Sequence, residues 1–287
     1  MTAPRIATII PAYNSAGTIG KAIASAQSQQ HAPDEIIVID DGSTDDTAAI
    51  ATTAGATVIR QANAGPAAAR NAGIASTSAE WIALLDADDS WRPDRIARQL
   101  PLLDDDHLAV VYSGHHVANK TPPIPPERLD FDTLWERNRI PTSTVLLRRT
   151  AWEAIGGFDS ARDLIGVEDY NLWLRLAHAG WRFAGVPARL VDYQPTDASL
   201  TSQTRRFATA ELAQVNRVAT ALGLDPARLR AKEFVLYLEY GLELFYFRDL
   251  ITAREFLQEA ARRGPLPVKA RLRLMASYLP FAAARAR

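Results

Sequence analysis

Residues 81–89 read Trp-Ile-Ala-Leu-Leu-Asp-Ala-Asp-Asp, and this stretch decides the fold class. An apolar run is followed by carboxylates at Asp86, Asp88 and Asp89. A compact run of this kind suits a strand that is buried on both faces, as in a sheet covered by helices. Ligands of open α/β sheets bind beyond the carboxyl ends of the strands. The stretch therefore predicts an α/β fold with a ligand site at these aspartates.

Further apolar runs on either side predict the rest of the sheet. They alternate with segments of helical character, as expected when crossover helices join parallel strands. Ser43 followed by Asp46 predicts a capped helix start, and Pro93 predicts a helix opening near Arg92. Four prolines within residues 119–128 predict a loop or lid. We expect strands at residues 6–10, 35–40, 57–60, 81–86, 108–112 and 144–147, a helix at 168–179, and β structure at 181–193.

The chain changes character near residue 200. Beyond Arg205 the apolar spacing becomes helical, with Leu236, Tyr240 and Leu244 at intervals of four. Turn signals at residues 223–226 and 264–267 divide this part, so we expect three or four helices. The sequence thus predicts one domain over residues 1–200 and a C-terminal helical region over residues 201–287.

The composition excludes several classes of protein. Apolar residues make up 47% and charged residues 23%, which is typical of a folded globular chain. The sequence has no cysteine, so any metal must take oxygen or imidazole ligands. Neither a secretory signal nor an apolar run long enough to span a membrane is visible. We therefore expect a cytoplasmic location.

The formal net charge of −1 hides an uneven distribution. Residues 201–287 carry +7, from 15 basic and 8 acidic residues, and residues 1–200 carry −8. From Arg262 onward seven residues are basic and none is acidic. A peripheral contact with the inner membrane face is one interpretation of this tail, and a solvated face of a helical hairpin is the other. Nucleic-acid binding is not supported, because the tail has no recognition motif.

Two groups of carboxylates are expected to meet at one edge of the sheet. Asp86, Asp88 and Asp89 end one predicted strand, and Asp40 and Asp41 end another. Gathering this much negative charge is unfavourable unless a cation or hydrogen-bond donors compensate it. Loop carboxylates can hold a hard cation that bridges two phosphate groups. A solvated turn explains either group alone, but their number and position favour a ligand.

Two more segments belong at the same edge. Pro11, Ala12, Tyr13 and Asn14 follow the first strand, where the tyrosine ring can stack on a base, although packing is the commoner role of tyrosine at a strand end. Arg70 lies among small residues in a predicted helix, from which its guanidinium can contact a pyrophosphate or a base.

Four motifs, taken in order, resemble those of the family 2 glycosyltransferases. They are Ile-Pro-Ala-Tyr-Asn (10–14), Val-Ile-Asp-Asp-Gly-Ser-Thr-Asp (38–45), Ala-Ala-Arg-Asn-Ala-Gly (68–73) and Leu-Leu-Asp-Ala-Asp-Asp (84–89). The resemblance covers roughly residues 5–195. It implies a GT-A fold, in which helices flank a Rossmann-like, mixed and mostly parallel sheet, with a nucleotide-sugar half at about 1–113 and an acceptor half at about 114–200.

The resemblance also implies an activity. The expected enzyme is an inverting transferase that moves a sugar from a nucleoside-diphosphate sugar, most commonly a UDP-sugar, to a saccharide or lipid-linked acceptor in polysaccharide or glycoconjugate biosynthesis. Asp88 and Asp89 would approach a divalent metal, Mg²⁺ or Mn²⁺, and which of the two is the principal ligand stays open. The donor would be held by Pro11, Ala12, Tyr13, Asn14, Asp41, Arg70, Asp86, Ala87 and Asp88.

The acceptor side of the family is matched by the segments 156–159 and 166–175. Asp169, beside Glu168, becomes the candidate base, because a carboxylate at a helix start can take the proton of an acceptor hydroxyl as that oxygen attacks the sugar. One such base with in-line displacement implies inversion. The alternative role for this acidic pair is a favourable charge at a helix N-terminus. The upstream motifs favour catalysis.

One segment departs from the family. Many relatives carry a histidine a few residues after a tyrosine, near the metal or diphosphate, whereas residues 193–200 contain none and place Thr196 or Asp197 there. Weaker metal affinity or a different closure over the diphosphate would follow. A sugar-nucleotide pyrophosphorylase is disfavoured, because residues 11–14 are not a Gly-rich basic phosphate loop. A non-catalytic nucleotide-sugar-binding or scaffold protein of the same fold is the remaining alternative.

Overall fold

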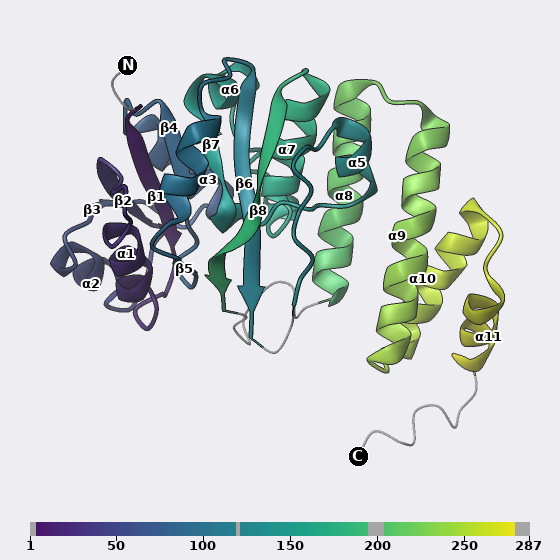
Figure 1. The fold of residues 1–287 in the computed structure, drawn as a ribbon. Coiled ribbons are helices and arrows are strands. Elements are labelled where there is room, and N and C mark those ends of the chain that lie inside the picture. Colours follow the sequence, from purple (N-terminus) through teal and green to yellow (C-terminus); the bar gives the residue numbers. More distant parts are fainter. Residues whose placement is uncertain (1–3, 119–120, 195–203, 279–287) are drawn as a thin grey trace. The chain divides into compact units, whose positions relative to one another are not determined.

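The apolar runs of the N-terminal part assemble into one sheet (Figure 1). The computed structural model describes residues 4–118, 121–194 and 204–278, which belong to two compact units, Met1–Thr196 and Asp197–Arg287. The strands of the first unit are β1 (Ile6–Ala12), β2 (Glu35–Asp40), β3 (Thr57–Arg60), β4 (Trp81–Leu84), β5 (Ser90–Trp91), β6 (Leu108–Val117), β7 (Leu146–Arg148) and β8 (Arg182–Tyr193).

The sheet is mixed and mostly parallel, which confirms the predicted fold class. Its order is β3-β2-β1-β4-β7-β6-β8-β5. Strands β3, β2, β1 and β4 pair in parallel, β7 runs antiparallel between β4 and β6, β8 is parallel to β6, and β5 is antiparallel to β8. The first unit also contains α1 (Ile19–Gln27), α2 (Thr47–Thr53), α3 (Pro66–Ala75), α4 (Arg95–Gln99), α5 (Phe131–Glu136), α6 (Arg149–Ala154) and α7 (Glu168–His178), with 3₁₀ turns at Leu100–Leu102, Thr142–Thr144 and Arg162–Leu164.

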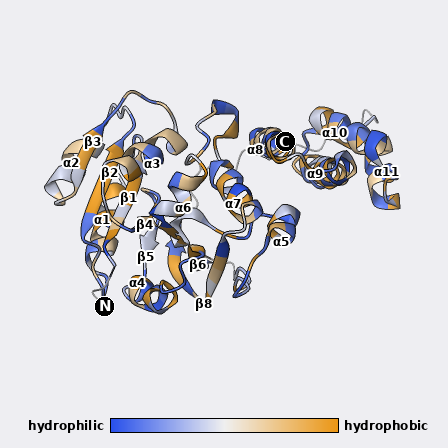
Figure 2. Cartoon of the chain, turned by 90° about the horizontal axis from the view of Figure 1, so that it is seen from above, coloured by the Kyte–Doolittle hydropathy of each residue, from blue (hydrophilic) through white to orange (hydrophobic). Residues whose placement is uncertain are grey.

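Both faces of the parallel half of the sheet are covered by helices. Ile6 and Ile10 of β1 pack into a buried cluster with Ile23 of α1. Ile9 faces α3 on the other side, because a Cβ added at Gly73 would lie 2.6 Å from Ile9 Cγ2. Figure 2 shows β1 and β2 in hydrophobic colours beside these helices. A strand buried on both faces needs consecutive apolar residues, which is why the runs were visible in the sequence.

Three of the predicted boundaries were wrong, and a specific contact or turn accounts for each. The strand expected at 81–86 ends at Leu84, because the Asp86 N–H donates to the hydroxyl of Ser143 at 3.0 Å instead of to a neighbouring strand. The strand expected at 144–147 begins at Leu146, after the 3₁₀ turn Thr142–Thr144. Helix α4 begins at Arg95, after a turn closed by the Arg95 N–H and the Arg92 carbonyl.

The predicted capping by Ser43 was also wrong. Asp46 is the N-cap of α2, and Ser43 Oγ instead accepts a hydrogen bond from the Asn14 N–H. The segment 121–128, part of the proline-rich loop, has no helix and pairs with β8 through one isolated bridge, Arg128 to Ala184. It is held closely there, because a Cβ on Gly185 would lie 2.4 Å from the Pro126 carbonyl.

The second unit is helical. Its described residues form α8 (Thr204–Leu222), α9 (Pro226–Tyr246), α10 (Leu250–Arg263) and α11 (Val268–Ala276), in agreement with the three or four helices expected. Asp225 and Asp249 cap α9 and α10 by accepting N–H groups of their first turns. A buried cluster of Leu257, Ala260, Leu266 and Ala270 joins the last helices. Among the described residues, no helix has the length and apolar character needed to cross a bilayer.

Candidate active site

The predicted site residues leave the sheet at one edge. β1 pairs with β2 so that Ala12 is opposite Asp40, and with β4 so that Ile9 is opposite Leu84. The residues that follow these parallel strands therefore emerge side by side. They are Tyr13 and Asn14 after β1, Asp41 after β2, and Asp86 to Asp89 after β4.

The loops after β1 and β2 are fastened to each other. Asn14 has the left-handed φ of 49° that asparagine tolerates. Its Oδ1 accepts the Thr44 N–H at 2.9 Å, and its N–H donates to Ser43 Oγ at 2.9 Å. Ala12 is buried, whereas the ring of Tyr13 is 53% exposed. Tyr13 is thus an accessible aromatic surface on a rigid turn, and Asn14 is the residue that shapes the turn.

The two aspartates after β2 have different surroundings. Asp40 is buried and accepts hydrogen bonds from the Arg60 side chain at 2.9 Å and from the Ser43 N–H at 3.0 Å. Asp41 is also buried, and it holds the loop that leads to α3. Its Oδ1 accepts bonds from the Gln61 side chain and the Ala64 N–H, and its Oδ2 accepts the Gly65 N–H at 2.8 Å.

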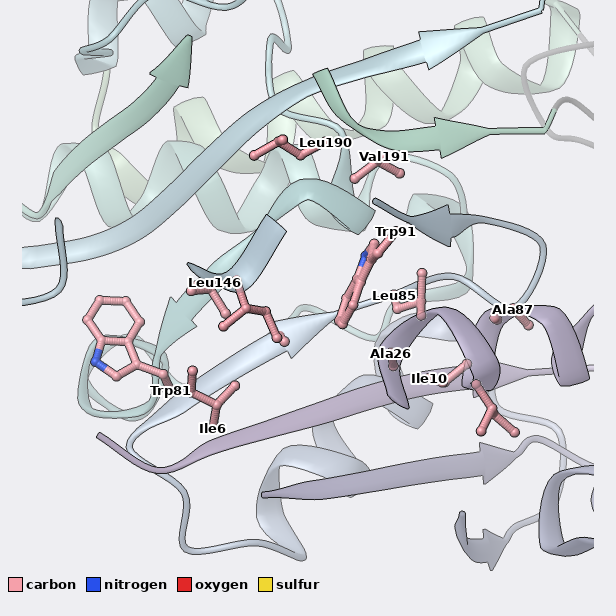
Figure 3. Packing of buried hydrophobic residues seen from close by; sticks show 14 of the residues in the cluster. Ile6, Ile10, Ala26, Trp81, Leu85, Ala87, Trp91, Leu146, Leu190 and Val191 are labelled. Carbon is pink, nitrogen blue, oxygen red and sulfur yellow. The ribbon is translucent and has the colours of Figure 1, made fainter. Parts of the chain in front are cut away.

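The loop after β4 alternates between anchoring and exposed residues. Leu85 and Ala87 are buried in the cluster below the loop, together with Trp91 (Figure 3). Asp86 and Asp88 are only partly buried. The apolar members therefore fix the backbone while the two carboxylates between them are presented at the edge of the sheet.

Asp88 and Asp89 differ in how their oxygens are used. Asp89 is buried, and its Oδ2 accepts the Ser143 hydroxyl at 2.6 Å while its Oδ1 accepts the Gln194 N–H at 3.3 Å. The Asp88 carboxylate accepts a hydrogen bond from its own backbone N–H, and no other residue in the described part of the chain binds it. Burial and the charge of Asp86 raise the pKa of Asp88 to about 6 and the pKa of Asp89 to about 8. The loop therefore gathers carboxylates that repel one another and that a cation would stabilise.

Arg70 connects this loop to helix α7. The buried guanidinium donates to Asp86 Oδ1 at 2.7 Å and to Glu168 Oε1 at 2.6 Å. Burial disfavours its charge, but Asp86 and Glu168 outweigh burial and raise the pKa of Arg70. Glu168 also accepts the Gly166 N–H at 2.6 Å. The sequence predicted that Arg70 contacts the nucleotide-sugar donor. In the structure its side chain bridges two carboxylates of the protein, which is a second role for this residue.

Asp169 lies beside this ion pair at the first turn of α7. Its Oδ2 accepts the Thr142 hydroxyl at 2.7 Å and lies 3.5 Å from Asn138 Nδ2. Burial, and then the charge of Glu168, raise its pKa to about 6. A carboxylate with this proton affinity is suited to accept a proton near neutral pH.

The turn Thr142–Thr144 contains two site residues that the sequence analysis missed. Thr142 contacts Asp169, and Ser143 contacts both Asp89 and the Asp86 N–H. Because β7 runs antiparallel to β4, the start of β7 lies where β4 ends. A run of hydroxyl residues directly before an antiparallel strand is the signal that could have identified them.

Side chains below the turn hold it in place. Three consecutive carbonyls of the turn each accept a buried donor from the segment that follows the aspartate loop. The donor–acceptor pairs are Trp91 Nε1 to Ser143 O at 2.8 Å, Gln99 Nε2 to Thr144 O at 2.9 Å, and Arg95 Nη2 to Val145 O at 2.8 Å. Buried donors of this kind fix both the position and the orientation of the turn.

These contacts close a ring around the site. The ring runs from Asp86 through Arg70 to Glu168, continues to Asp169 and Thr142, and returns through Ser143 to Asp86. The aspartate loop and the candidate base are therefore positioned relative to each other twice, by an ion-pair route and by a hydroxyl route.

The described residues offer few protein ligands for a metal ion. No group of three or more acidic or imidazole side chains with suitable geometry occurs among the residues that the structure describes. A hard cation can nevertheless be bound by one or two carboxylates and the oxygens of a diphosphate, as Mg²⁺ commonly is. Asp88, with Asp86 and Asp89 next to it, offers that donor set. Thr196 and Asp197, which stand where relatives carry histidine, lie outside the described residues.

Comparison with known proteins places this geometry in a family. The model of the family described as Glycosyl transferase family 2 matches residues 7–161. The succinoglycan biosynthesis protein ExoO of Rhizobium meliloti (strain 1021) is 42% identical over 105 residues, which cover 35% of this chain and 30% of ExoO. The chain thus spans less than a third of that relative. The UDP-Glc:alpha-D-GlcNAc-diphosphoundecaprenol beta-1,3-glucosyltransferase WfaP of Escherichia coli is 32% identical over 184 residues, which cover 61% of this chain and 71% of WfaP.

A solved structure shares the fold. The mannosyltransferase PcManGT from Pyrobaculum calidifontis, in complex with GDP-Man and Mn²⁺, superposes with a TM-score of 0.67 at 21% identity, covering 98% of this chain and 86% of that one. The sheet and its flanking helices therefore form the predicted GT-A fold. Since the family model matches more than half of the sequence, this chain belongs to glycosyl transferase family 2.

Proposed function

We propose that the chain is a metal-dependent, inverting glycosyltransferase that uses a nucleoside-diphosphate sugar. The observation that carries this proposal is the ring that joins the aspartate loop to Asp169. A transferase must hold the departing diphosphate and the attacking hydroxyl on opposite sides of one carbon, and here two rigid routes fix the groups suited to each task.

The donor is assigned to the edge formed by β1, β2 and β4. The exposed ring of Tyr13 is suited to stack on the base, with Pro11, Ala12 and Asn14 shaping its turn. Oδ2 of Asp41 accepts one bond from the protein and can accept another from a base N–H. Arg70 acts on the donor mainly by holding Asp86, with Ala87 anchoring the loop beneath the sugar. A UDP-sugar is favoured, since the relative WfaP is named for UDP-Glc.

The metal is assigned to Asp88, with Asp89 as a second ligand. The carboxylate of Asp88, which no other described residue binds, and the mutual repulsion in the loop fit a hard divalent cation, Mg²⁺ or Mn²⁺. Such an ion, when bound, neutralises the charge that develops on the departing diphosphate. Ser143 then keeps Asp89 oriented through its hydrogen bond of 2.6 Å.

Asp169 is proposed as the base. Its carboxylate takes the proton of the acceptor hydroxyl as that oxygen attacks the anomeric carbon, and the bond to the diphosphate breaks on the opposite face. In-line attack of this kind inverts the configuration. Glu168, whose two oxygens already accept bonds from Arg70 and the Gly166 N–H, is assigned a supporting role, because its charge helps to raise the pKa of Asp169.

The acceptor is proposed to be a saccharide or a lipid-linked saccharide. WfaP is named for a diphosphoundecaprenol-linked acceptor, and ExoO for succinoglycan biosynthesis. We propose that the donor binds to the half at about residues 1–113 and the acceptor to the half at about residues 114–200. Residues 201–287 are assigned to a separate helical region. One sheet spans both halves, because β6 runs from Leu108 to Val117. A lipid-linked acceptor would require the enzyme to work at a membrane surface.

Calorimetric titration tests this proposal. Wild type, Asp88→Asn, Asp169→Asn and the control Asp106→Asn, an exposed aspartate after α4, are each titrated with UDP, TDP and GDP, with and without Mn²⁺ or Mg²⁺. We expect metal-dependent binding of one diphosphate, weakened at least about tenfold by Asp88→Asn and unchanged by the other two substitutions. Metal-dependent hydrolysis of the matching donor sugar should fall about 10²–10⁴-fold in Asp169→Asn.

Two outcomes would contradict the proposal in different ways. Absence of binding to all three diphosphates under every metal condition would remove the donor assignment. Binding without any metal-dependent hydrolysis or transfer would favour a non-catalytic nucleotide-sugar-binding or scaffold protein with the same fold.

A further inference from the structure

Exposed large apolar side chains are concentrated in the helical unit. In the described part of the first unit, only Tyr13 and Ile124 belong to this class. The helical unit contributes Val235, Tyr246, Phe247, Ile251, Val268, Leu272, Met275 and Tyr278. Contiguous apolar exposure on a folded unit commonly marks a surface that another body covers.

Helix α11 carries three of these side chains on one face. Val268, Leu272 and Met275 are spaced by four and three residues, which places them within about 60° of one another at 100° per residue. Their exposed fractions are 71%, 57% and 59%. The opposite face is packed, because Ala270 is fully buried and Leu274 contacts the cluster around Leu257. The apolar stripe therefore faces away from the unit.

Positive charge borders this stripe on both sides. By the same helical geometry, Arg271 lies on one flank and Lys269 and Arg273 lie on the other. All three are exposed, and no acidic residue occurs in α11. Figure 2 shows hydrophilic and hydrophobic colours together on this helix. An apolar stripe between cationic flanks is typical of a helix that lies in the plane of a membrane interface.

The turn between α9 and α10 lies next to the end of α11. The guanidinium of Arg273 stacks on the Phe245 ring at 4.8 Å, and that of Arg254 stacks on the Tyr278 ring at 4.0 Å. The end of α11 thus packs beside the turn that presents Tyr246, Phe247 and Ile251. We call the combined surface the α11 patch, made of Tyr246, Phe247, Ile251, Val268, Lys269, Arg271, Leu272, Arg273, Met275 and Tyr278.

We propose that the α11 patch binds the surface of an anionic lipid bilayer. Its apolar stripe enters the boundary between headgroups and acyl chains, while Lys269, Arg271 and Arg273 contact anionic headgroups. A second copy of the chain is a poorer occupant, because two identical patches would bring their cationic flanks together. This surface stands independently of the proposed transferase activity. It would hold the chain where lipid-linked molecules are found.

Vesicle sedimentation of the full chain tests the proposal. Neutral phosphatidylcholine vesicles are compared with vesicles that also contain phosphatidylglycerol, using wild type, Leu272→Gln/Met275→Gln and Lys269→Gln/Arg271→Gln. Val235→Gln serves as a matched control, since it removes an exposed apolar side chain of α9 outside the patch. All the substituted side chains are exposed, so circular dichroism should show unchanged helix content.

We expect wild type and the Val235 variant to bind the anionic vesicles equally, with binding suppressed by salt. Each double variant should partition at least about tenfold less. Equal binding by all four proteins, or no binding by wild type, would overturn the proposal. So would a wild-type dimer that Leu272→Gln/Met275→Gln converts to a monomer without a change in vesicle binding. UDP binding by the same variants should be unchanged, which separates this result from the proposed function.

Discussion

At the scale of single residues, the Asp169 carboxylate is subject to opposing influences. Burial and the charge of Glu168 raise its pKa, whereas the Thr142 hydroxyl and the charge of Arg70 lower it, and the resulting value is about 6. A general base acts only in its ionised form. Activity should therefore be constant above this pH and fall as the pH decreases through about 6.

Replacing Thr142 with valine should shift the acidic limb of the pH–activity profile, which is the part where activity falls as the pH decreases. The hydroxyl donates to Asp169 Oδ2 and stabilises the ionised form, so its loss raises the pKa of the carboxylate. We expect the acidic limb of kcat to shift upward by about one to two pH units, since a hydrogen bond to a charged group contributes about 1.5–3 kcal/mol and one pKa unit corresponds to about 1.4 kcal/mol. The profile is measured from donor turnover between about pH 5 and about pH 9, which covers the wild-type limb near pH 6 and the shifted limb of the variant.

Thr142→Ser is the matched control for this prediction. Serine retains the hydroxyl, so the limb should return close to its wild-type position. If Thr142→Val lowers turnover by the same factor at every pH, the residue has only a structural part in the turn, and the proposed role of Asp169 loses its support from this contact.

At the scale of elements, the position of α3 depends on small residues. A Cβ on Gly73 would lie 2.6 Å from Ile9 Cγ2 and 3.1 Å from Ile39 Cγ1, so this turn of the helix touches β1 and β2 directly. The same close approach brings Arg70, three residues earlier, to Asp86 and Glu168. The glycine is thus a requirement for packing rather than for backbone conformation.

Gly73→Ala should destabilise the first unit by about 1–2 kcal/mol. Overpacking a tight contact costs about 1–3 kcal/mol, and the better helix propensity of alanine returns at most about 1 kcal/mol. Gly20→Ala in α1 is the control, because its added Cβ would lie at an ordinary 3.6 Å from Ile50 Cγ2. That variant should be neutral or slightly stabilised. Urea unfolding measures both, and a stabilised Gly73→Ala would show that α3 can move off the sheet.

The elements also show where sequence reasoning succeeds. Strand 35–40 was predicted with its observed bounds, because its burial requires an uninterrupted apolar run. Strand 57–60 was also predicted with its observed bounds, although it is the edge strand and its residues are exposed or only partly buried. The aspartate loop was found because its carboxylates directly follow such a run. Both signals are local, so one sequence suffices to detect them.

The missed features depend on distant partners. Asp86 leaves the strand because its N–H meets Ser143, which lies 57 positions later in the chain. Ser43 does not cap α2, because Asn14 of another loop donates to it. Thr142 gains its place from the antiparallel direction of β7, which short-range periodicity does not specify.

At the scale of the whole molecule, the chain has two units with separate cores. The first is built on the sheet, and the second on the cluster around Leu257. All six tryptophans of the sequence, Trp81, Trp91, Trp135, Trp152, Trp173 and Trp181, belong to the first unit. Tryptophan fluorescence therefore reports the unfolding of the first unit, whereas calorimetry reports both units.

A nucleotide should stabilise only one of these units. A ligand present at 100 times its Kd stabilises the folded state by about 2.7 kcal/mol, which raises the midpoint of a domain of this size by roughly 5–10 °C. We expect UDP with Mn²⁺ to raise the fluorescence midpoint by this amount and to leave a second, fluorescence-silent calorimetric transition in place. Asp88→Asn should reduce the shift to about half or less at the same nucleotide concentration, because at least about tenfold weaker binding leaves at most about 1.4 kcal/mol of stabilisation.

The opposite result is equally informative about the molecule. If calorimetry and fluorescence report one transition that moves as a whole, the helical unit unfolds together with the sheet, and a boundary near residue 200 does not separate independent domains. Substitutions in the α11 patch would then be expected to change the stability of the first unit. With two transitions, the same substitutions leave the fluorescence midpoint unchanged, and their effects on vesicle binding can be attributed to the patch alone.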